Sequence, residues 1–478
     1  MRNVVKYTGI FFERKIELTK EIKENKMGVM PENKLLLTMS VPIMISMMVQ
    51  ALYNIVDTVF VSKLGTDALT ALSLAFPIQN LMIAVSTGTG VGMNALLSKS
   101  LGEKNFDRAN KTACNGVFLA ICSFLLFLFV GLFLTEPFFK MFGSSESVTE
   151  YGSAYLTICC GFSIGLFGQI TFERLLQATG KTTLSMISQL TGAIFNIIFD
   201  PLLIYGIGIF PEMGVSGAAV ATVLGQIIAC LAAIFLNHRY NKEIAVSLKG
   251  FKPDADIIKR IYSVGLPSIA MGSIGSVMTT GINQIVRICG NVAETAQAVF
   301  GLYFKIQSFI FMPVFGLNNG MVPIIAYNYG ARKKSRLIKT MKLSVFYACV
   351  MMFVGVALFH AFPDMLLNLF STGEEADMAA IISIGIPALR RISLSFVFAG
   401  FCIVTLSVFQ ALGHGFLSLV TSLLRQLGVL LPSALILALT TKNVNIIWFA
   451  FPIAEIAAVT ISALFLKKVY QKEIKNLD

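Results

Sequence analysis

Apolar stretches of about 20 residues recur along the chain, from Leu35 almost to the C-terminus. They lack the alternation of apolar and polar positions that is typical of strands, and they exceed the roughly 10 residues of a membrane β-strand. A stretch of this length spans a bilayer as a helix. We therefore predict an all-α polytopic membrane protein with twelve transmembrane helices. The predicted spans cover residues 35–61, 68–97, 112–135, 150–172, 184–206, 217–237, 261–286, 294–327, 340–362, 379–406, 415–439 and 445–466.

The charge distribution supports this interpretation. Only 13% of the 478 residues are charged and the mean hydropathy is +0.76, whereas soluble proteins are about 25% charged. Most Lys and Arg residues lie in the two tails and the even-numbered loops; the odd-numbered loops hold only Lys63, Lys140, Arg287 and Lys442. This asymmetry places both termini in the cytoplasm. The net charge of +12 therefore reflects topology, and no nucleic-acid partner is expected.

The two halves of the chain repeat each other. Five residues of the first half recur at a constant spacing and in the same order in the second; the pairs are Gln79 and Gln307, Gly88 and Gly316, Gly92 and Gly320, Gly102 and Gly330, and Arg108 and Arg336. Pro42 likewise corresponds to Pro267, and "QATGKTTLS" to "QALGHGFLS". Chance similarity between apolar segments would not keep this order, so we infer an internal duplication.

Each half contributes six spans, so both halves enter the membrane from the same side and form a parallel repeat. We predict two six-helix lobes around a central cleft. The expected organisation is a cytoplasmic tail (1–34), an N-lobe (35–239), a cytoplasmic linker (240–256), a C-lobe (257–468) and a second cytoplasmic tail (469–478).

Two carboxylates, Asp57 and Asp200, lie deep within apolar segments. An ionised carboxylate costs about 2.5–3.5 kcal/mol or more to insert at the bilayer centre, so their presence suggests cation binding. Asn196 lies one turn before Asp200, and Pro201 leaves the carbonyl of Ile197 without its helical partner. These oxygens suit sodium, or a carboxyl group that alternates between protonated and ionised forms. The alternative is that Asp200 lies near a helix end and is solvated.

A polar stripe surrounds the first of these carboxylates. Gln50, Asn54 and Asp57 stand at i, i+4 and i+7 on one helical face, and Tyr53 lies beside them. Because a lipid-facing stripe would be costly, we expect it to face the lobe interior or the cleft. The alternative is a hydrogen-bonded network that only locks helices together.

Other intramembrane charges give weaker signals. The pairs 173–174 (Glu-Arg) and 390–391 (Arg-Arg) are predicted to lie near span ends, where long side chains reach water. Glu455 is deeper, with Lys305 or Arg391 as expected partners. We keep Glu173, Arg391 and Glu455 as secondary candidates and favour a structural role for each.

The sequence offers little sign of catalysis. Its three histidines, His238, His360 and His414, show no metal-ligand spacing, and no phosphate-binding glycine-rich loop is present. Neither an enzyme nor direct use of ATP is expected.

Three segments resemble the multidrug and toxic compound extrusion (MATE) family. They are "YNIVDTVFVSKLGTDALTALSLAFPI", "GTGVGMNALLSKSLGEKNFDRAN" and "FGLNNGMVPIIAYNYGARKKSRL". The resemblance, which covers about residues 35–466, implies export of bulky, often cationic compounds in exchange for protons or sodium. The DinF-like branch of the family uses a cation site in the N-lobe. Asp57, Asn196, Asp200 and Thr222 are similar to that branch's site residues, so the resemblance implies proton or sodium coupling there.

The vibrio-type branch instead depends on acids in spans seven and ten. The corresponding segments here, "TTGINQIVRI" and "IPALRRISLSF", contain none. We therefore expect a multidrug efflux antiporter of small organic cations or amphiphiles, without a cofactor other than the coupling ion. We expect a monomer in a prokaryotic plasma (inner) membrane, working by alternating access of the two lobes.

A flippase for a lipid-linked saccharide or other amphiphile is the alternative function. Such a protein should line its cleft with cations for a pyrophosphate group. The residues that keep this alternative open are Arg287, Lys305, Arg390, Arg391 and Arg425.

Overall fold

The structure is a computed structural model that describes residues 24–247, 250–370 and 375–477. Its elements in chain order are α2 (Lys26–Val29), α3 (Glu32–Ser62), α4 (Thr66–Gly102), α5 (Phe106–Phe133), α6 (Thr135–Met141), α7 (Glu146–Gly161), α8 (Ile164–Ala178), α9 (Thr182–Ile204), α10 (Gly214–Tyr240), α11 (Ala255–Val286), η1 (Arg287–Val292), α12 (Ala293–Gly330), α13 (Lys334–Ala361), α14 (Pro363–Phe370), α15 (Glu375–Ser393), α16 (Phe396–Leu412), α17 (Gly415–Leu423), η2 (Leu424–Leu430), α18 (Leu431–Thr441), α19 (Val444–Ile447), α20 (Ala450–Val469) and η3 (Tyr470–Ile474).

The prediction of an all-α protein with twelve spans is confirmed. Within the described ranges, ten helical segments are long and apolar enough to cross a membrane, and two bent helix pairs complete the twelve. Many large side chains on the outer surface are apolar and exposed, such as Phe133 (61%) and Phe353 (65%). Contact with lipid explains this exposure, since a soluble protein rarely presents such a surface.

The fourth and tenth spans are not the continuous helices that we predicted. Helices α7 and α8 meet at a 44° bend, and α15 and α16 at a 49° bend. At the first bend the Ser163 hydroxyl donates to the Cys160 carbonyl at 2.8 Å, and at the second Ser395 donates to Ile392 at 2.6 Å. A serine that bonds a preceding carbonyl competes with the helical ladder and bends it. The same device therefore breaks the equivalent span in each half.

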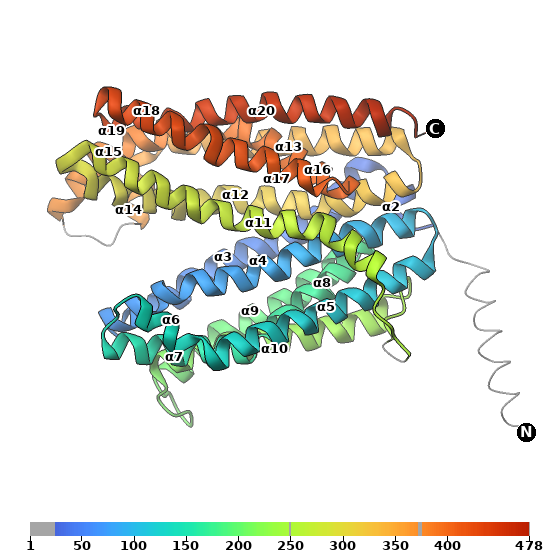
Figure 1. Cartoon of the computed structure of the whole chain (residues 1–478), viewed down its shortest axis with the longest axis horizontal. Coiled ribbons are helices and arrows are strands. Elements are labelled where there is room, and N and C mark those ends of the chain that lie inside the picture. The colour runs from blue at the N-terminus through green and yellow to red at the C-terminus, as the bar shows by residue number, and fades with distance from the viewer. Residues whose placement is uncertain (1–23, 248–249, 371–374, 478) are drawn as a thin grey trace, which may run out of the picture.

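Figure 1 shows the two lobes, with α3 to α10 in one and α11 to α20 in the other. Across the boundary, α3 packs against α12, and α4 packs against both α11 and α12. Helix α2 and the C-terminus lie at the same end of the bundle, which we call the basic end because Lys99, Lys104 and Lys333 belong to it. The lobes approach each other at the basic end and diverge towards the opposite end.

Two of the repeated glycines explain how closely the lobes approach. A Cβ at Gly102 of α4 would lie 2.0 Å from the Tyr327 carbonyl oxygen, and a Cβ at Gly330 of α12 would lie 2.2 Å from the Lys99 carbonyl oxygen. Each glycine thus admits the backbone of the opposite lobe, which any larger residue would displace. The duplication has placed a symmetrical backbone contact at the basic end.

Candidate functional site in the N-lobe

A polar cavity of about 40 Å³ lies inside the N-lobe, between α3, α8, α9 and α10. Its lining consists of Gln50, Tyr53, Gln169, Gln189, Gly192, Ala193, Asn196, Thr222, Gly225 and Gln226. The small residues of α9 and α10 let these two helices pack closely, and a Cβ at Gly225 would lie 2.9 Å from the Gly192 carbonyl. Most of the long polar side chains around this space are amides, which can both donate and accept hydrogen bonds.

Three of the predicted site residues form one connected group. The Asn196 amide of α9 donates to Asp200 Oδ1 at 3.2 Å and approaches Thr222 Oγ1 of α10 at 3.5 Å. Asp200 is fully buried, so the alternative of a solvated carboxylate near a helix end is wrong. Asn196 stands one turn before Asp200, as the sequence predicts. Its amide orients Oδ1 of the carboxylate, whereas Oδ2 has no hydrogen-bond partner among the described residues.

Asp57 approaches this group from α3. Its Oδ1 atom is buried and has no hydrogen-bond partner among the described residues, and α3 packs against α9, so that Asp57 is close enough to Asp200 for their charges to interact. Asp200 Oδ2 and Asn196 Oδ1 are likewise buried without a partner in the described part of the chain. Three uncompensated oxygen acceptors therefore lie in one region of the N-lobe, which is costly unless a positive charge or donor satisfies them.

The donor set fits a hard monovalent cation or protons. Two carboxylates, an amide oxygen and a hydroxyl are oxygen ligands of the kind that hard cations prefer. Among the described residues there is no group of three or more His, Cys, Asp or Glu side chains arranged to hold a metal ion. Sodium would be held by Asp57, Asn196, Asp200 and Thr222, whereas protons would be held by the carboxyl groups of Asp57 and Asp200.

The polar stripe of α3 faces the lobe interior, as predicted. Gln50 and Tyr53 line the cavity, and Gln189 of α9 donates to Gln50 Oε1 at 3.2 Å. The side chain of Asn54 lies outside the part that the structure describes. The hydrogen bond between α3 and α9 fits the helix-locking alternative as well, so one stripe both joins the helices and borders the cavity.

Three lining glutamines were missed in the sequence. Each stands at helical spacing from a residue that was recognised: Gln189 is seven before Asn196, Gln226 is four after Thr222, and Gln169 is four before Glu173. Extending the i, i+4 and i+7 search from the recognised residues would have found them.

Glu173 and Arg174 correct another expectation. They are only 6% and 8% exposed, so the prediction that their side chains reach water is wrong. Gln169 donates to Glu173 Oε1 at 3.0 Å, which places Glu173 beside the cavity. The Arg174 guanidinium donates to Asn319 Oδ1 of α12 at 3.0 Å and therefore joins the two lobes. These hydrogen bonds offset part of the cost of burying the two charges away from water.

The secondary candidates of the C-lobe have structural partners. Glu455 of α20 pairs with Arg425 at 2.7 Å, so the expected partners Lys305 and Arg391 were wrong. Arg425 belongs to η2, a π-helical segment whose extra residue per turn shifts the side chains that follow. Arg391 donates to the Asn445 carbonyl at 2.8 Å, and its guanidinium lies over the Phe449 ring.

Comparison with known proteins identifies the family. The profile of the MatE family matches residues 42–202 and 267–436, once in each lobe. The chain belongs to the MatE family. The double match also agrees with the duplication seen in the sequence, because the two matched segments cover equivalent spans.

Relatives in sequence and in structure agree with this assignment. The chain is 27% identical to the multidrug export protein MepA of Staphylococcus haemolyticus, over 80% of this chain and 82% of the relative. It is 26% identical to an FAD transporter of Shewanella oneidensis, over 72% and 76% respectively. A multidrug resistance MATE family transporter in an outward-facing conformation superposes with a TM-score of 0.88 at 25% identity, covering 96% and 99%.

Members of the MatE family are membrane transporters and not enzymes, which confirms the prediction that this chain has no catalytic function. The family's bacterial members move small molecules across the inner membrane. This chain is therefore a membrane transporter.

Proposed function

We propose that this protein exports bulky, often cationic compounds in exchange for protons or sodium that bind in the N-lobe. The observation that carries the proposal is the group of uncompensated oxygens on Asp57 of α3 and on Asn196 and Asp200 of α9, two helices that contain candidate membrane spans. Such atoms favour whatever cation can reach them. The likeness to a multidrug export protein supports the export of drugs.

The exchange follows from competition for negative charge. A cationic compound in the N-lobe and a coupling ion both favour ionised Asp57 and Asp200, so binding of one lowers the affinity for the other. Ion entry from outside would then drive release of the compound outwards. The reciprocity of this coupling is thermodynamic, because each ligand must change the other's affinity by the same factor.

Alternating access is the movement that this proposal requires. The described close contacts between the lobes lie at the basic end, and the lobes diverge at the opposite end. The positive-inside rule assigns the basic end to the cytoplasm. The conformation is then outward-facing, and the opposite state requires the basic end to open.

The alternative of a lipid-linked saccharide flippase receives less support. Three of its five candidate cations have protein partners: Arg425 pairs with Glu455, Arg391 with a backbone carbonyl, and Arg390 donates to the His360 carbonyl at 3.3 Å. Cations that are already paired offer little to a pyrophosphate. Transport of an anionic compound such as the relative's FAD is a second candidate function, and only the buried Arg174 favours it.

The test is export of ethidium from reconstituted vesicles under an imposed pH gradient or an imposed sodium gradient. We expect at least one gradient to drive transport, and Asp57→Asn or Asp200→Asn to abolish the driven component. Asp67→Asn is the matched control, because Asp67 is an exposed carboxylate of the same lobe that accepts from Ser147 at 2.6 Å.

Equal expression and monodisperse elution establish that the variants fold. Driven export by both site variants at the rate of Asp67→Asn would contradict the assignment of the coupling site. If neither gradient changes the rate of ethidium export by the unmodified protein, the proposed antiport is wrong.

A further inference from the structure

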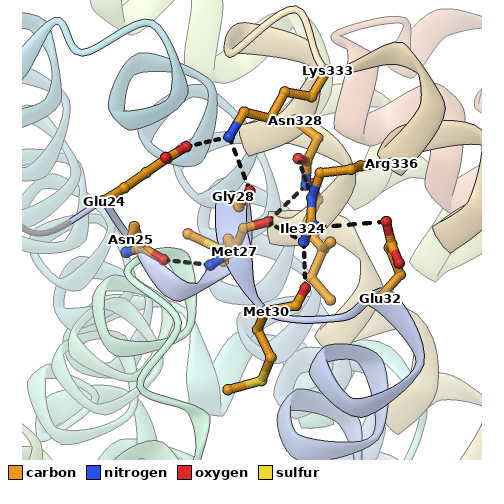
Figure 2. Close-up of polar contacts among 10 residues, drawn as sticks. All are labelled: Glu24, Asn25, Met27, Gly28, Met30, Glu32, Ile324, Asn328, Lys333 and Arg336. Atoms are coloured by element: carbon orange, nitrogen blue, oxygen red, sulfur yellow. Dashed lines mark hydrogen bonds and ion pairs between the residues drawn. The ribbon is translucent and has the colours of Figure 1, made fainter.

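The segment 24–32 lies across the basic end, immediately before the first membrane span. It contains the single turn of α2, in which Met27 is fully buried and Gly28 is buried as well. Figure 2 shows that side chains of α12, of the α12–α13 loop and of the first turn of α13 converge on its backbone. A single helical turn makes too few internal hydrogen bonds to be stable alone, so the burial of this segment depends on its contacts with the two lobes.

One side of the segment is attached to the N-lobe. The Asn25 amide donates to the Thr179 carbonyl at 3.1 Å and also to the Glu243 carboxylate. Lys26 packs beside Gly180. Burial lowers the pKa of Lys26, and the nearby charge of Lys181 lowers it further, so docking of the segment carries a cost that its other contacts must offset.

The other side is held by the C-lobe. The Arg336 guanidinium donates to the carbonyls of Met30 at 2.5 Å and Met27 at 3.3 Å. The Asn328 amide donates to the Met27 carbonyl at 3.0 Å, and the Lys333 ammonium to the Gly28 carbonyl at 2.9 Å. These are hydrogen bonds between the C-lobe and a segment that is covalently continuous with the N-lobe.

Further ion pairs strengthen the same attachment. Arg336 pairs with Glu32 at 3.4 Å, and Lys339 pairs with the other oxygen of Glu32 at 3.0 Å. Lys333 also pairs with Glu24. The Glu32 carboxylate is only 13% exposed and the Arg336 side chain 17%, so this pair is partly desolvated and less screened by solvent than an ordinary surface pair.

The internal repeat shows that these contacts are a specialisation of one half. Arg108 is the repeat equivalent of Arg336, and it donates to Ser100 Oγ at 2.8 Å and pairs with Glu103, both within its own lobe. In the second half the residue equivalent to Glu103 is Ala331. Arg336 keeps the equivalent of the bond to Ser100, since its Nε donates to Asn328 Oδ1 at 3.3 Å, but it lacks the acidic partner of Arg108 and binds the segment of the opposite lobe instead.

The loop backbone is the same in both halves, so the difference lies in the side chains. Lys104 and its equivalent Arg332 both have φ near 56°. The next residue is Asn105 in the first half, where its side chain caps α5 by accepting from the Arg108 amide at 3.0 Å. In the second half it is Lys333, which extends to the segment instead of capping α13.

We propose that residues 24–32 form a latch that closes the basic end and stabilises the outward-facing state, with Arg336 as its principal positioning residue. The proposal rests on the alternating access described above. For the basic end to open, α12 must leave α3, and the carbonyls of Met27, Gly28 and Met30 must leave Asn328, Lys333 and Arg336. The latch thereby sets the population of the two states without contacting the transported compound or the ion.

Distances between spin labels on the two lobes test the latch directly. One pair, at the exposed positions Lys111 and Ser335, reports the basic end; the other, at Lys63 and Arg287, reports the opposite end. Pulsed electron resonance is recorded in lipid nanodiscs without drug and at fixed pH and sodium. These distances do not depend on transport, so the latch is examined separately from the coupling ion.

In molecules whose basic end is open, the Lys111–Ser335 distance is longer and the Lys63–Arg287 distance is shorter. Arg336→Ala should raise the fraction of such molecules at least about tenfold over that in the unmodified protein. Loss of charge-assisted hydrogen bonds to three acceptors supports at least that factor. Arg108→Ala is the matched control at the equivalent repeat position, and we expect less than about a twofold change. Equal distributions for the two variants would overturn the proposal.

A second measurement does not depend on the stability of Arg336→Ala. Glu24→Cys and Lys333→Cys, in a background without the native cysteines, are joined by a reducible bifunctional thiol reagent. Locking this contact should stop ethidium export, and reduction should restore it. Full export by the cross-linked protein would show that the segment moves with the C-lobe and is no latch. If no gradient drives export but Arg336→Ala still shifts the distances, the latch stands and only the proposed antiport fails.

Discussion

The backbone contact between Gly102 and the Tyr327 carbonyl makes a single methyl group decisive for closure of the basic end. Gly102→Ala would place a Cβ 2.0 Å from that oxygen, whereas real Cβ contacts do not fall below 3.0 Å. The obstructing atom is backbone on α12, so no rotamer change can relieve it. Helices α4 and α12 must separate by about 1 Å, and they belong to different lobes.

The size of the effect follows from the clash in the closed state. Overpacking of this kind costs about 1–3 kcal/mol, and a rigid backbone oxygen argues for the upper part of that range. The higher helix propensity of alanine stabilises α4 equally in both states, so it does not change the equilibrium between them. A penalty of about 2 kcal/mol or more on the closed basic end corresponds to at least roughly a thirtyfold shift in that equilibrium.

Gly301→Ala is the matched control, because Gly301 lies on α12 towards the opposite end and has no heavy atom within 4 Å of the Cβ position. Initial rates of ethidium export and the spin-label distance at the basic end are measured for both variants. We expect Gly102→Ala to lengthen that distance and slow export, and Gly301→Ala to behave as the unmodified protein. Equal behaviour of the two variants would refute the reasoning that the basic end closes through backbone contact.

Three further predictions concern the sites. Drug affinity in detergent should fall as the pH is lowered or sodium is added, and Asp200→Asn should abolish at least one of these responses; responses unchanged by the substitution would make Asp200 structural. Glu455→Gln should lower the free energy of unfolding by about 1–3 kcal/mol, because it removes the negative charge that offsets the partly buried Arg425 guanidinium. The double variant Glu455→Leu with Arg425→Met should restore most of that loss; thermal unfolding measures both, and equal losses would show that the ion pair is not the cause. Cross-linking cysteines introduced in place of Lys63 and Arg287 should stop export, and unimpaired export would exclude separation of the lobes at that end.

Much of the fold was accessible from the sequence because bilayer length and repeat order are properties of the chain alone. The twelve spans and the order of the repeated glycines needed no knowledge of partners. The structural role of these glycines could not be predicted in the same way, because nothing in the sequence indicates that Gly102 contacts Tyr327 of the other half. The helix breaks at Ser163 and Ser395 were missed because a serine within an apolar run bends a helix only in the rotamer that bonds a preceding carbonyl.

In the candidate site, contacts within one helix could be predicted from the sequence, whereas contacts between helices could not. Asn196 and Asp200 are neighbours on one helical face, so their contact could be predicted from spacing. The Glu455–Arg425 pair joins residues 30 positions apart on two helices, and its register depends on the π-helical segment η2. Charge alone therefore indicated that Glu455 needs a cation but could not choose among the candidates.

Helix α3 connects the two functional regions of this protein. It carries Asp57 within the N-lobe site, and near its start Ser40 donates to the Leu317 carbonyl of α12 at 3.2 Å. Its first residue, Glu32, is the acid to which Arg336 binds. A ligand that moves the Asp57 end of α3 relative to α9 must therefore either bend the helix or displace the latch. Because the latch contacts are hydrogen bonds of fixed geometry, a small displacement weakens several of them together. The equilibrium at the basic end would then respond to occupancy of the ion site through one continuous helix, without any ligand reaching the basic end.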